Sequence, residues 1–158
     1  MESQRDAAEE LYDGIAVTQH EHYLAGLHFA RLHYLIGIPV VLFTAIVGRS
    51  IFASRQRQAS DRIAIGMLSV SATVLAGLQT FLNYNERAEK HRMAGARYGA
   101  LNWQLALMLA HDSGCSGLDD IIKQLDVLAQ ESPNIPQAVH KVIAGYRPRW
   151  QRATKSAS

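Results

Sequence analysis

The sequence predicts an all-α membrane protein, in which an antiparallel hairpin of two transmembrane helices continues into long helical arms. Two stretches without Asp, Glu, Lys or Arg, residues 32–48 and 63–85, are 17 and 23 residues long. A helix of about 20 residues spans the hydrocarbon core of a bilayer. Outside these stretches, apolar residues recur at spacings of three and four, which is typical of amphipathic helices.

Composition excludes several other classes of protein. Of the 158 residues, 48% are hydrophobic and 19% are charged, with one Cys, 4 Pro and 11 Gly. These values do not fit a disordered chain, a collagen-like chain or a disulfide-stabilised domain. Because 16 Lys and Arg face 14 Asp and Glu, the net charge is only +2, and no nucleic-acid polymer is expected as a partner.

The predicted membrane domain covers residues 1–110 and begins with an arm over residues 5–33. A first transmembrane helix follows over residues 34–52. Pro39 falls in its opening turns, where a proline costs little because the N–H groups there have no helical partner. Arg49, near the other end, either reaches lipid headgroups or contributes to a charged ring at the mouth of a pore. Residues spaced by three and four form a seam along the arm: Leu11, Ile15, Thr18, His22, Ala25, Phe29 and Leu32.

A second transmembrane helix is predicted over residues 63–82. The linker between the two is so short that it forces an antiparallel hairpin, with both termini on one side of the membrane. Basic residues near the two ends of the hairpin number four and five, which does not decide the orientation. The alternative is a hairpin buried in a soluble helical bundle. That alternative predicts amphipathic helices, because a bundle of 158 residues cannot bury a helix of this length on every side.

Small and polar residues follow one face of the second transmembrane helix. Such a face either packs against another helix or lines water in an oligomer. Gly37, Thr44 and Gly48 on the first transmembrane helix are candidates for the opposing surface. This polar stripe consists of Ser69, Thr73, Ala76, Thr80 and Asn83.

A second arm is predicted over residues 83–110, as a helix that continues straight out of the second span. Its apolar residues follow the spacing of a coiled coil or bundle helix, so they are candidates for an oligomer seam, and the two arms could also pack together. The seam residues of this arm are Ala94, Tyr98, Leu101, Leu105 and Met108.

Cationic residues follow directly on the second span. They would either bind an anionic ligand such as a nucleotide phosphate or contact anionic lipid headgroups. With Arg49, this set of interface candidates comprises Arg87, Lys90, His91 and Arg92.

Residues 111–146 form a short helical extension. Ser116 and Asp119 resemble a capping box that opens an amphipathic helix over residues 118–130. Its apolar face contains Ile121, Ile122, Leu125 and Leu128. Two prolines then interrupt the chain, a short helix follows over residues 137–144, and residues 147–158 form a basic tail.

No catalytic, cofactor or metal site is expected. The seven histidines include no Glu-x-x-His or His-x-x-x-His pair, the spacing that directs ligands into one helical core. Cys115 has no helix-coupled partner to activate it, and no phosphate-binding loop or nucleophile motif is present. The chain is therefore not expected to be an enzyme.

Two runs, in order along the chain and separated by a short loop, carry a family resemblance: GIPVVLFTAIVGRSIFAS at residues 37–54 and LAGLQTFLNYNERAEKHRMAGARYGAL at residues 75–101. They resemble the SLATT family, the SMODS- and SLOG-associating two-transmembrane effectors. The similarity extends over residues 23–108, and FLNYNERAEKHR, with the later Arg97 and Tyr98, is its most specific part.

The resemblance implies an effector of a prokaryotic anti-phage conflict system. Members are proposed to form pores in the inner membrane or disrupt it when a nucleotide signal is made, which arrests or kills the infected cell. It also implies cytoplasmic termini, a homo-oligomer, and an upstream nucleotide cyclase or sensor protein as partner. Two alternatives remain at this stage: a non-conducting membrane scaffold that recruits a soluble partner through residues 118–130, and a soluble helical enzyme.

Overall fold

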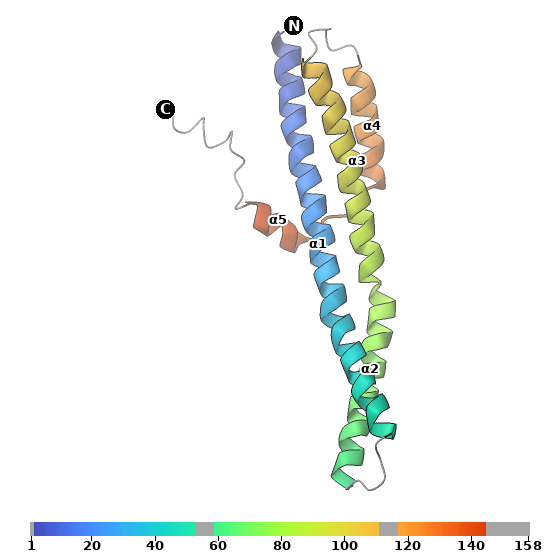
Figure 1. Cartoon of the computed structure of the whole chain (residues 1–158). Helices are drawn as coiled ribbons and strands as arrows, with labels where there is room; N and C mark the ends of the chain where they lie inside the picture. Colours follow the sequence, from blue (N-terminus) through green and yellow to red (C-terminus); the bar gives the residue numbers. More distant parts are fainter. Residues whose placement is uncertain (1, 53–58, 111–116, 145–158) are drawn as a thin grey trace. The chain divides into compact units, whose positions relative to one another are not determined.

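The computed structural model describes residues 2–52, 59–110 and 117–144, and this part of the chain is all-α (Figure 1). The all-α prediction is therefore confirmed. The helices are α1 (Glu2–Phe52), α2 (Ala59–Leu82), α3 (Tyr84–Ala110), α4 (Leu118–Glu131) and α5 (Gln137–Ala144). They form two compact units, which we call the arm unit (Met1–His28 and Ala88–Ser158) and the hairpin unit (Phe29–Arg87).

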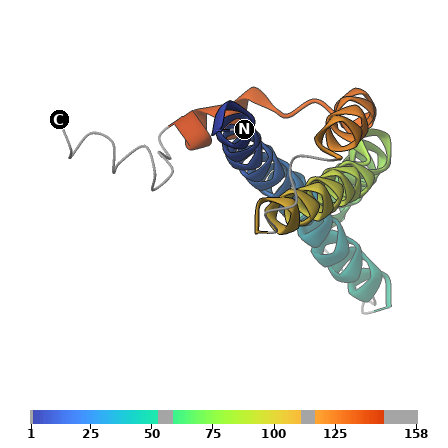
Figure 2. The ribbon, with the colours of Figure 1, turned by 90° about the horizontal axis from the view of Figure 1, so that it is seen from above.

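The arm unit is a small helical bundle in which α4 lies alongside α3 (Figures 1 and 2). The N-terminal part of α1 supplies Ala8 and Ile15 to its core. These side chains are buried with residues from α3 and α4, because the apolar seams of the helices face one another. The remaining core residues are Tyr98, Leu101, Leu105, Ile121 and Leu128.

The hairpin unit pairs the C-terminal part of α1 with α2. Ala72 is buried at 4% exposure, and Gly37 lies so close to Gln79 that a Cβ on the glycine would be 3.1 Å from the Gln79 Nε2 atom. At the end of the unit opposite the 53–58 linker, the rings of Phe29 and Tyr84 stack with centroids 6.1 Å apart. Small residues thus allow α1 and α2 to approach closely.

The first departure from the sequence prediction is at Pro39. We expected this proline in the opening turns of a separate transmembrane helix, but α1 is one helix of 51 residues with Pro39 inside it. A proline in a helix interior removes one backbone hydrogen bond, here the one to the carbonyl of Leu35. The helix continues because only that one bond is lost while the turns on both sides remain bonded.

The second departure is at Asn83. We expected the second arm to continue straight from the second span, but Asn83 has a φ of 43° and separates α2 from α3. Asparagine is one of the few residues that adopts this left-handed conformation readily. Its N–H donates to the Gln79 carbonyl, and its carbonyl accepts from the Arg87 N–H, both at 3.2 Å. The side-chain amide donates to the Glu86 carboxylate.

The third departure is at the start of α4. Its N-cap is Gly117, with a φ of 113° and no side-chain capping bond, whereas the predicted capping box places Ser116 at this position. Ser116, like Cys115 and the basic tail, lies outside the described residues. The N–H groups of Asp120 and Ile121 instead donate to the Gly117 carbonyl, each at 3.2 Å. A glycine suits this position because it adopts a positive φ without steric cost.

Candidate functional site

The main candidate site is the apolar surface of the hairpin unit. Two helical segments, Arg5–Ser50 and Ser60–Ala110, contain windows long and apolar enough to cross a membrane, and 0% and 6% of these windows are buried in the structure. Within the described residues the rest of the chain therefore leaves these windows uncovered, whereas a hairpin buried in a soluble bundle would have them mostly buried. The most exposed large side chains of the unit are Tyr34, Leu35, Val41, Ile63, Met67 and Phe81.

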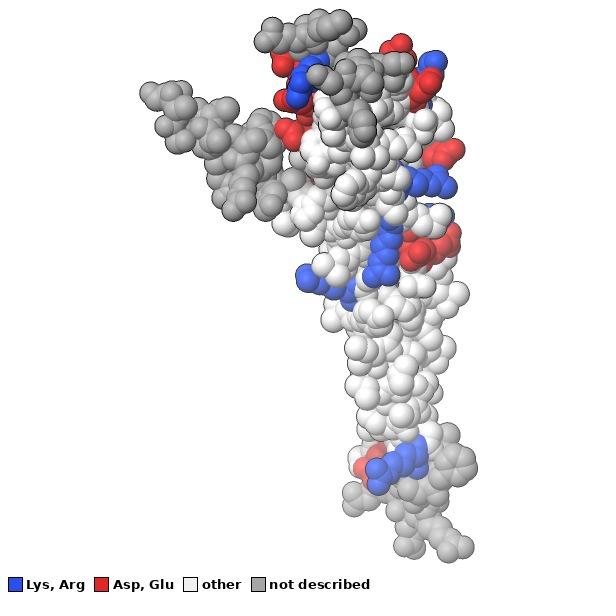
Figure 3. Space-filling view, turned by 45° about the horizontal axis from the view of Figure 1, so that its top comes forward, with Lys and Arg blue, Asp and Glu red and all other residues white. Residues whose placement is uncertain are grey.

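Charged residues lie at the two ends of the hairpin. Arg31 and Arg87 are exposed at one end, and Arg49, Asp61 and Arg62 are exposed at the other. Figure 3 shows no Lys, Arg, Asp or Glu on the visible face of the hairpin between these ends. Since Arg31 and Arg49 are 18 residues apart on one helix, they are separated by about 27 Å along its axis, close to the hydrocarbon thickness of a bilayer.

The polar stripe does not form the contact between α1 and α2. Ser69, Thr73, Thr80 and Asn83 are exposed, and only Ala76 is half-buried. The helix contact uses the neighbouring face instead, where Leu68, Ala72, Leu75 and Gln79 are buried or half-buried. The stripe thus remains available to water or to another helix.

Hydroxyl groups on the stripe bond to their own helix. Thr73 Oγ1 donates to the Ser69 carbonyl at 2.9 Å, and Thr80 Oγ1 donates to the Ala76 carbonyl at 3.1 Å. Such bonds satisfy the hydroxyl donor and leave the oxygen able to accept from water or from another helix.

Of the three residues predicted to oppose the stripe, only Gly37 lies against α2, where it meets Gln79. Thr44 is exposed and donates to the Val40 carbonyl at 2.6 Å. A Cβ at Gly48 would have no neighbour within 4 Å. These three residues of α1 therefore do not form one continuous surface against α2.

The predicted seam of the second arm lies inside the arm unit. Ala94, Tyr98, Leu101 and Leu105 are buried, and Met108 is half-buried and packs against the same core. Tyr98, Leu101, Leu105 and Met108 pack in a cluster with residues of α1 and α4 of the same chain. The seam therefore packs within one chain, which agrees with the expectation that the two arms pack together. It is not exposed for contact with a second copy.

The interface candidates divide into two groups. Arg49, Arg87, Lys90 and Arg92 are exposed, as contact with headgroups or an anion requires. His91 is 2% exposed and faces the interior of the arm unit. It therefore does not share a surface with the four cations.

His91 belongs to a buried histidine pair that the sequence pattern did not predict. The Nδ1 atoms of His22 and His91 are 3.1 Å apart, and the Tyr98 ring stacks on His22 with centroids 5.3 Å apart. Burial, and secondarily the neighbouring His91, lower the pKa of His22 to about 4, and burial also lowers the pKa of His91. The sequence did contain a signal for this pair. His22 lies on the seam of the first arm, and His91 lies three residues before Ala94, in register with the seam of the second arm.

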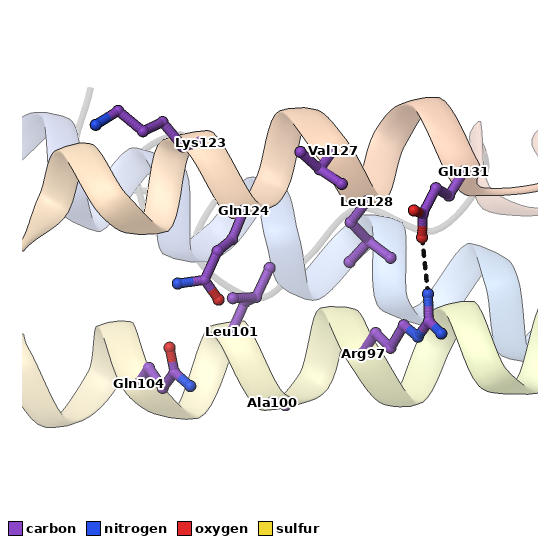
Figure 4. Close-up of a pocket in the computed structure, with 9 residues that line it drawn as sticks. All are labelled: Arg97, Ala100, Leu101, Gln104, Lys123, Gln124, Val127, Leu128 and Glu131. Atoms are coloured by element: carbon purple, nitrogen blue, oxygen red, sulfur yellow. Dashed lines mark hydrogen bonds and ion pairs between the residues drawn. The ribbon is translucent and has the colours of Figure 1, made fainter.

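A groove of about 440 Å³ lies between α3 and α4. Leu101 of α3 and Leu128 of α4 point toward one another across it, and Arg97 pairs with Glu131 at one end with 3.0 Å between nitrogen and oxygen (Figure 4). The groove is mainly apolar. Within the described residues, no group of three or more His, Cys, Asp or Glu side chains could hold a metal ion.

The fold and the exposed hairpin define the class: an all-α protein with two helices long and apolar enough to cross a membrane. No protein-family model, curated protein or solved structure matches the chain.

Proposed function

We propose that the protein is a membrane effector of a prokaryotic anti-phage conflict system, similar in role to the SLATT family that its sequence resembles. In this proposal the hairpin lies in the inner membrane with both termini in the cytoplasm. A nucleotide signal from an upstream cyclase or sensor then causes the protein to oligomerise and form a pore or disrupt the membrane. Growth arrest or cell death follows.

The observation that carries this proposal is the uncovered apolar surface of the hairpin, bounded by charged residues at both ends. Water would hydrate that surface at a cost of about 25 cal/mol for each Å² of apolar area, whereas lipid would not. Arginine side chains at the ends of a hydrophobic helix extend to the headgroups. A bilayer therefore fits both the apolar surface and its cationic ends.

The polar stripe supports the conducting part of the proposal. Two helices alone cannot enclose water, so conduction requires several copies of the hairpin. Because Thr73 and Thr80 are exposed and not packed against α1, these hydroxyls could line a channel between copies. The neighbouring Leu78 is exposed as well but offers no polar group, which makes it a matched control.

The test is release of a fluorescent dye from liposomes that contain the purified full-length protein. We expect release when a nucleotide trigger is supplied, and we expect Thr73→Leu and Thr80→Leu to reduce it several-fold more than Leu78→Ala. If neither dye nor ions are released by inserted protein under any trigger tested, the pore proposal fails. Equal effects of the three substitutions would exclude the stripe as the channel lining.

A non-conducting scaffold is the second candidate, because α4 leaves Ile122 and Val127 at 41% and 56% exposure, and Val127 lines the α3–α4 groove. Ile121 and Leu128, the two buried residues of α4, lie in the core of the arm unit and cannot recruit a partner without rearrangement. Induced expression distinguishes the two candidates. Loss of membrane potential supports the pore, whereas a non-toxic protein that retains a soluble partner at the membrane supports the scaffold.

A further inference from the structure

Helix α3 has a second apolar face that the core of the arm unit does not use. Met93, Trp103 and Leu107 are 50%, 73% and 58% exposed, and Ala96 and Ala100 are exposed between them. Ala100 also lies at the edge of this face where it lines the α3–α4 groove. These five residues, which we call the outer seam, lie about half a helical turn from the buried seam, since each residue advances about 100° around the helix. An apolar face of this kind on a monomer commonly marks a contact surface.

The spacing of the outer seam indicates the shape of its partner. From Met93 to Leu107 the intervals are three, four, three and four, the pattern by which one helix packs against another in a coiled coil. The two small residues at the centre permit close approach, and Trp103 offers the largest anchor. A parallel copy of the same helix meets these requirements, because knobs and holes then repeat at the same heights on both partners.

The charges beside the outer seam are compatible with a second copy. Arg97, which flanks the seam, pairs with Glu131 of its own chain at 3.0 Å, and Arg92 lies 3.9 Å from Glu89. Each of these arginines has a carboxylate of its own chain nearby. The repulsion between the arginines of two adjacent copies would therefore be partly compensated. Gln104, on the same flank, is uncharged.

We propose that the outer seam, Met93, Ala96, Ala100, Trp103 and Leu107, is the surface through which α3 packs in parallel against α3 of a second copy. This inference rests on the proposed function in one respect, namely that the copies share a membrane, which holds them parallel and raises their local concentration. The seam covers about two heptads, fewer than the roughly three to four that characterise an extended coiled coil. Association is therefore weak in dilute solution and depends on confinement in the membrane.

The test is disulfide cross-linking of the full chain in native membranes, with Cys115→Ser as background. Ala100→Cys occupies a core position of the proposed contact, where the two Cα atoms come within disulfide range. Val142→Cys, on α5 at a residue that is 66% exposed, is the matched control. We expect a dimer band under mild oxidation for Ala100→Cys and about tenfold less for Val142→Cys.

A second substitution tests the anchor. Adding Trp103→Asp to Ala100→Cys should reduce the dimer band by about tenfold or more, as expected for a central aromatic contact. Adding Ile122→Asp, at an exposed apolar residue outside the seam, should leave the band unchanged. Equal cross-linking of Ala100→Cys and Val142→Cys, a product whose mass includes another protein, or no effect of Trp103→Asp would each overturn the proposal.

Dye release measured on the same set of proteins separates the two proposals. Cross-linked protein that stays in the membrane but releases nothing contradicts the pore and leaves the outer seam intact. Release without any Ala100→Cys dimer contradicts the outer seam and leaves the pore intact.

Discussion

The Nδ1 atoms of His22 and His91 lie 3.1 Å apart in the interior of the arm unit, 69 positions apart in the chain. At this distance one Nδ1 carries the proton and donates, and the other accepts. Both side chains are 2% exposed. The contact therefore joins α1 to α3 only while at least one imidazole keeps an unprotonated Nδ1.

The first prediction concerns pH. The pKa of His22 is about 4 in the folded protein and about 6.5 in an unfolded chain. Between these values the unfolded state binds more protons, so stability is complete above about pH 6.5 and decreases as the pH falls toward 4. The loss is on the order of 1–3 kcal/mol. Thermal unfolding of the protein in detergent, followed by circular dichroism across this range, measures it.

The control for the pH prediction replaces both histidines. The double variant His22→Leu with His91→Leu removes both titrating groups and leaves no orphaned imidazole. We expect its unfolding temperature to depend much less on pH. An unchanged slope would show that the pH dependence arises elsewhere in the chain.

The second prediction concerns the core of the arm unit. Ile15 is 2% exposed and packs in the cluster formed by α1, α3 and α4, so Ile15→Ala should reduce the free energy of unfolding by about 2–4 kcal/mol. Leu27, on the same helix, is 44% exposed, and Leu27→Ala should cost less than about 1 kcal/mol. Chemical denaturation in detergent checks both. Comparable losses at the two sites would contradict the placement of α1 in this core.

The third prediction uses two glycines of α1. A Cβ at Gly26 would lie 3.1 Å from the Ala88 carbonyl oxygen and 3.2 Å from Arg92 Cγ, whereas a Cβ at Gly14 would have no neighbour within 4 Å. Gly14→Ala should stabilise the protein by about 0.5–1 kcal/mol, because alanine is the better helix former. Gly26→Ala should lose this gain, because α1 and α3 must separate slightly. Thermal unfolding of the two variants side by side provides the measurement, and an equal gain at both sites would contradict the close approach at Gly26.

The fourth prediction distinguishes lipid from water around α2. Val74 and Ile63 are 56% and 69% exposed, so arginine at either site would be tolerated about equally in water. In a bilayer, Val74→Arg lies near the middle of the span and should cost about 2.5–3.5 kcal/mol of insertion free energy, whereas Ile63→Arg lies near the end and should cost far less. A glycosylation-based insertion assay measures the difference. Equal insertion of the two variants would argue against a transmembrane α2.

Much of the fold could be predicted from the sequence because local patterns determine it. The spacing of three and four correctly identified the faces that pack in the arm unit, including Ile15, Tyr98 and Leu105. The helices predicted at residues 118–130 and 137–144 agree with Leu118–Glu131 and Gln137–Ala144 within one residue. The lengths of the two stretches without charged residues were sufficient to identify the two helices that could span a membrane.

The partners of each face could not be predicted, because periodicity gives a face but not what covers it. Tyr98 and Leu101 were candidates for contacts between chains, yet they pack against their own α1 and α4. The outer seam was not predicted, because its residues alternate with those of the buried seam. Met93 lies one residue before Ala94, Trp103 lies two residues after Leu101, and polar neighbours obscure the second repeat. Asn83 and Pro39 depend on single-residue backbone geometry, which the hydrophobic pattern does not report.

Whether the hairpin lies in lipid is tested most directly by alkaline carbonate extraction of membranes from cells that express the full chain. We expect the protein to remain in the membrane pellet with integral proteins, because its uncovered apolar hairpin cannot leave the bilayer without exposure to water. A protein that is released to the supernatant as a folded, monodisperse helical chain would contradict the account.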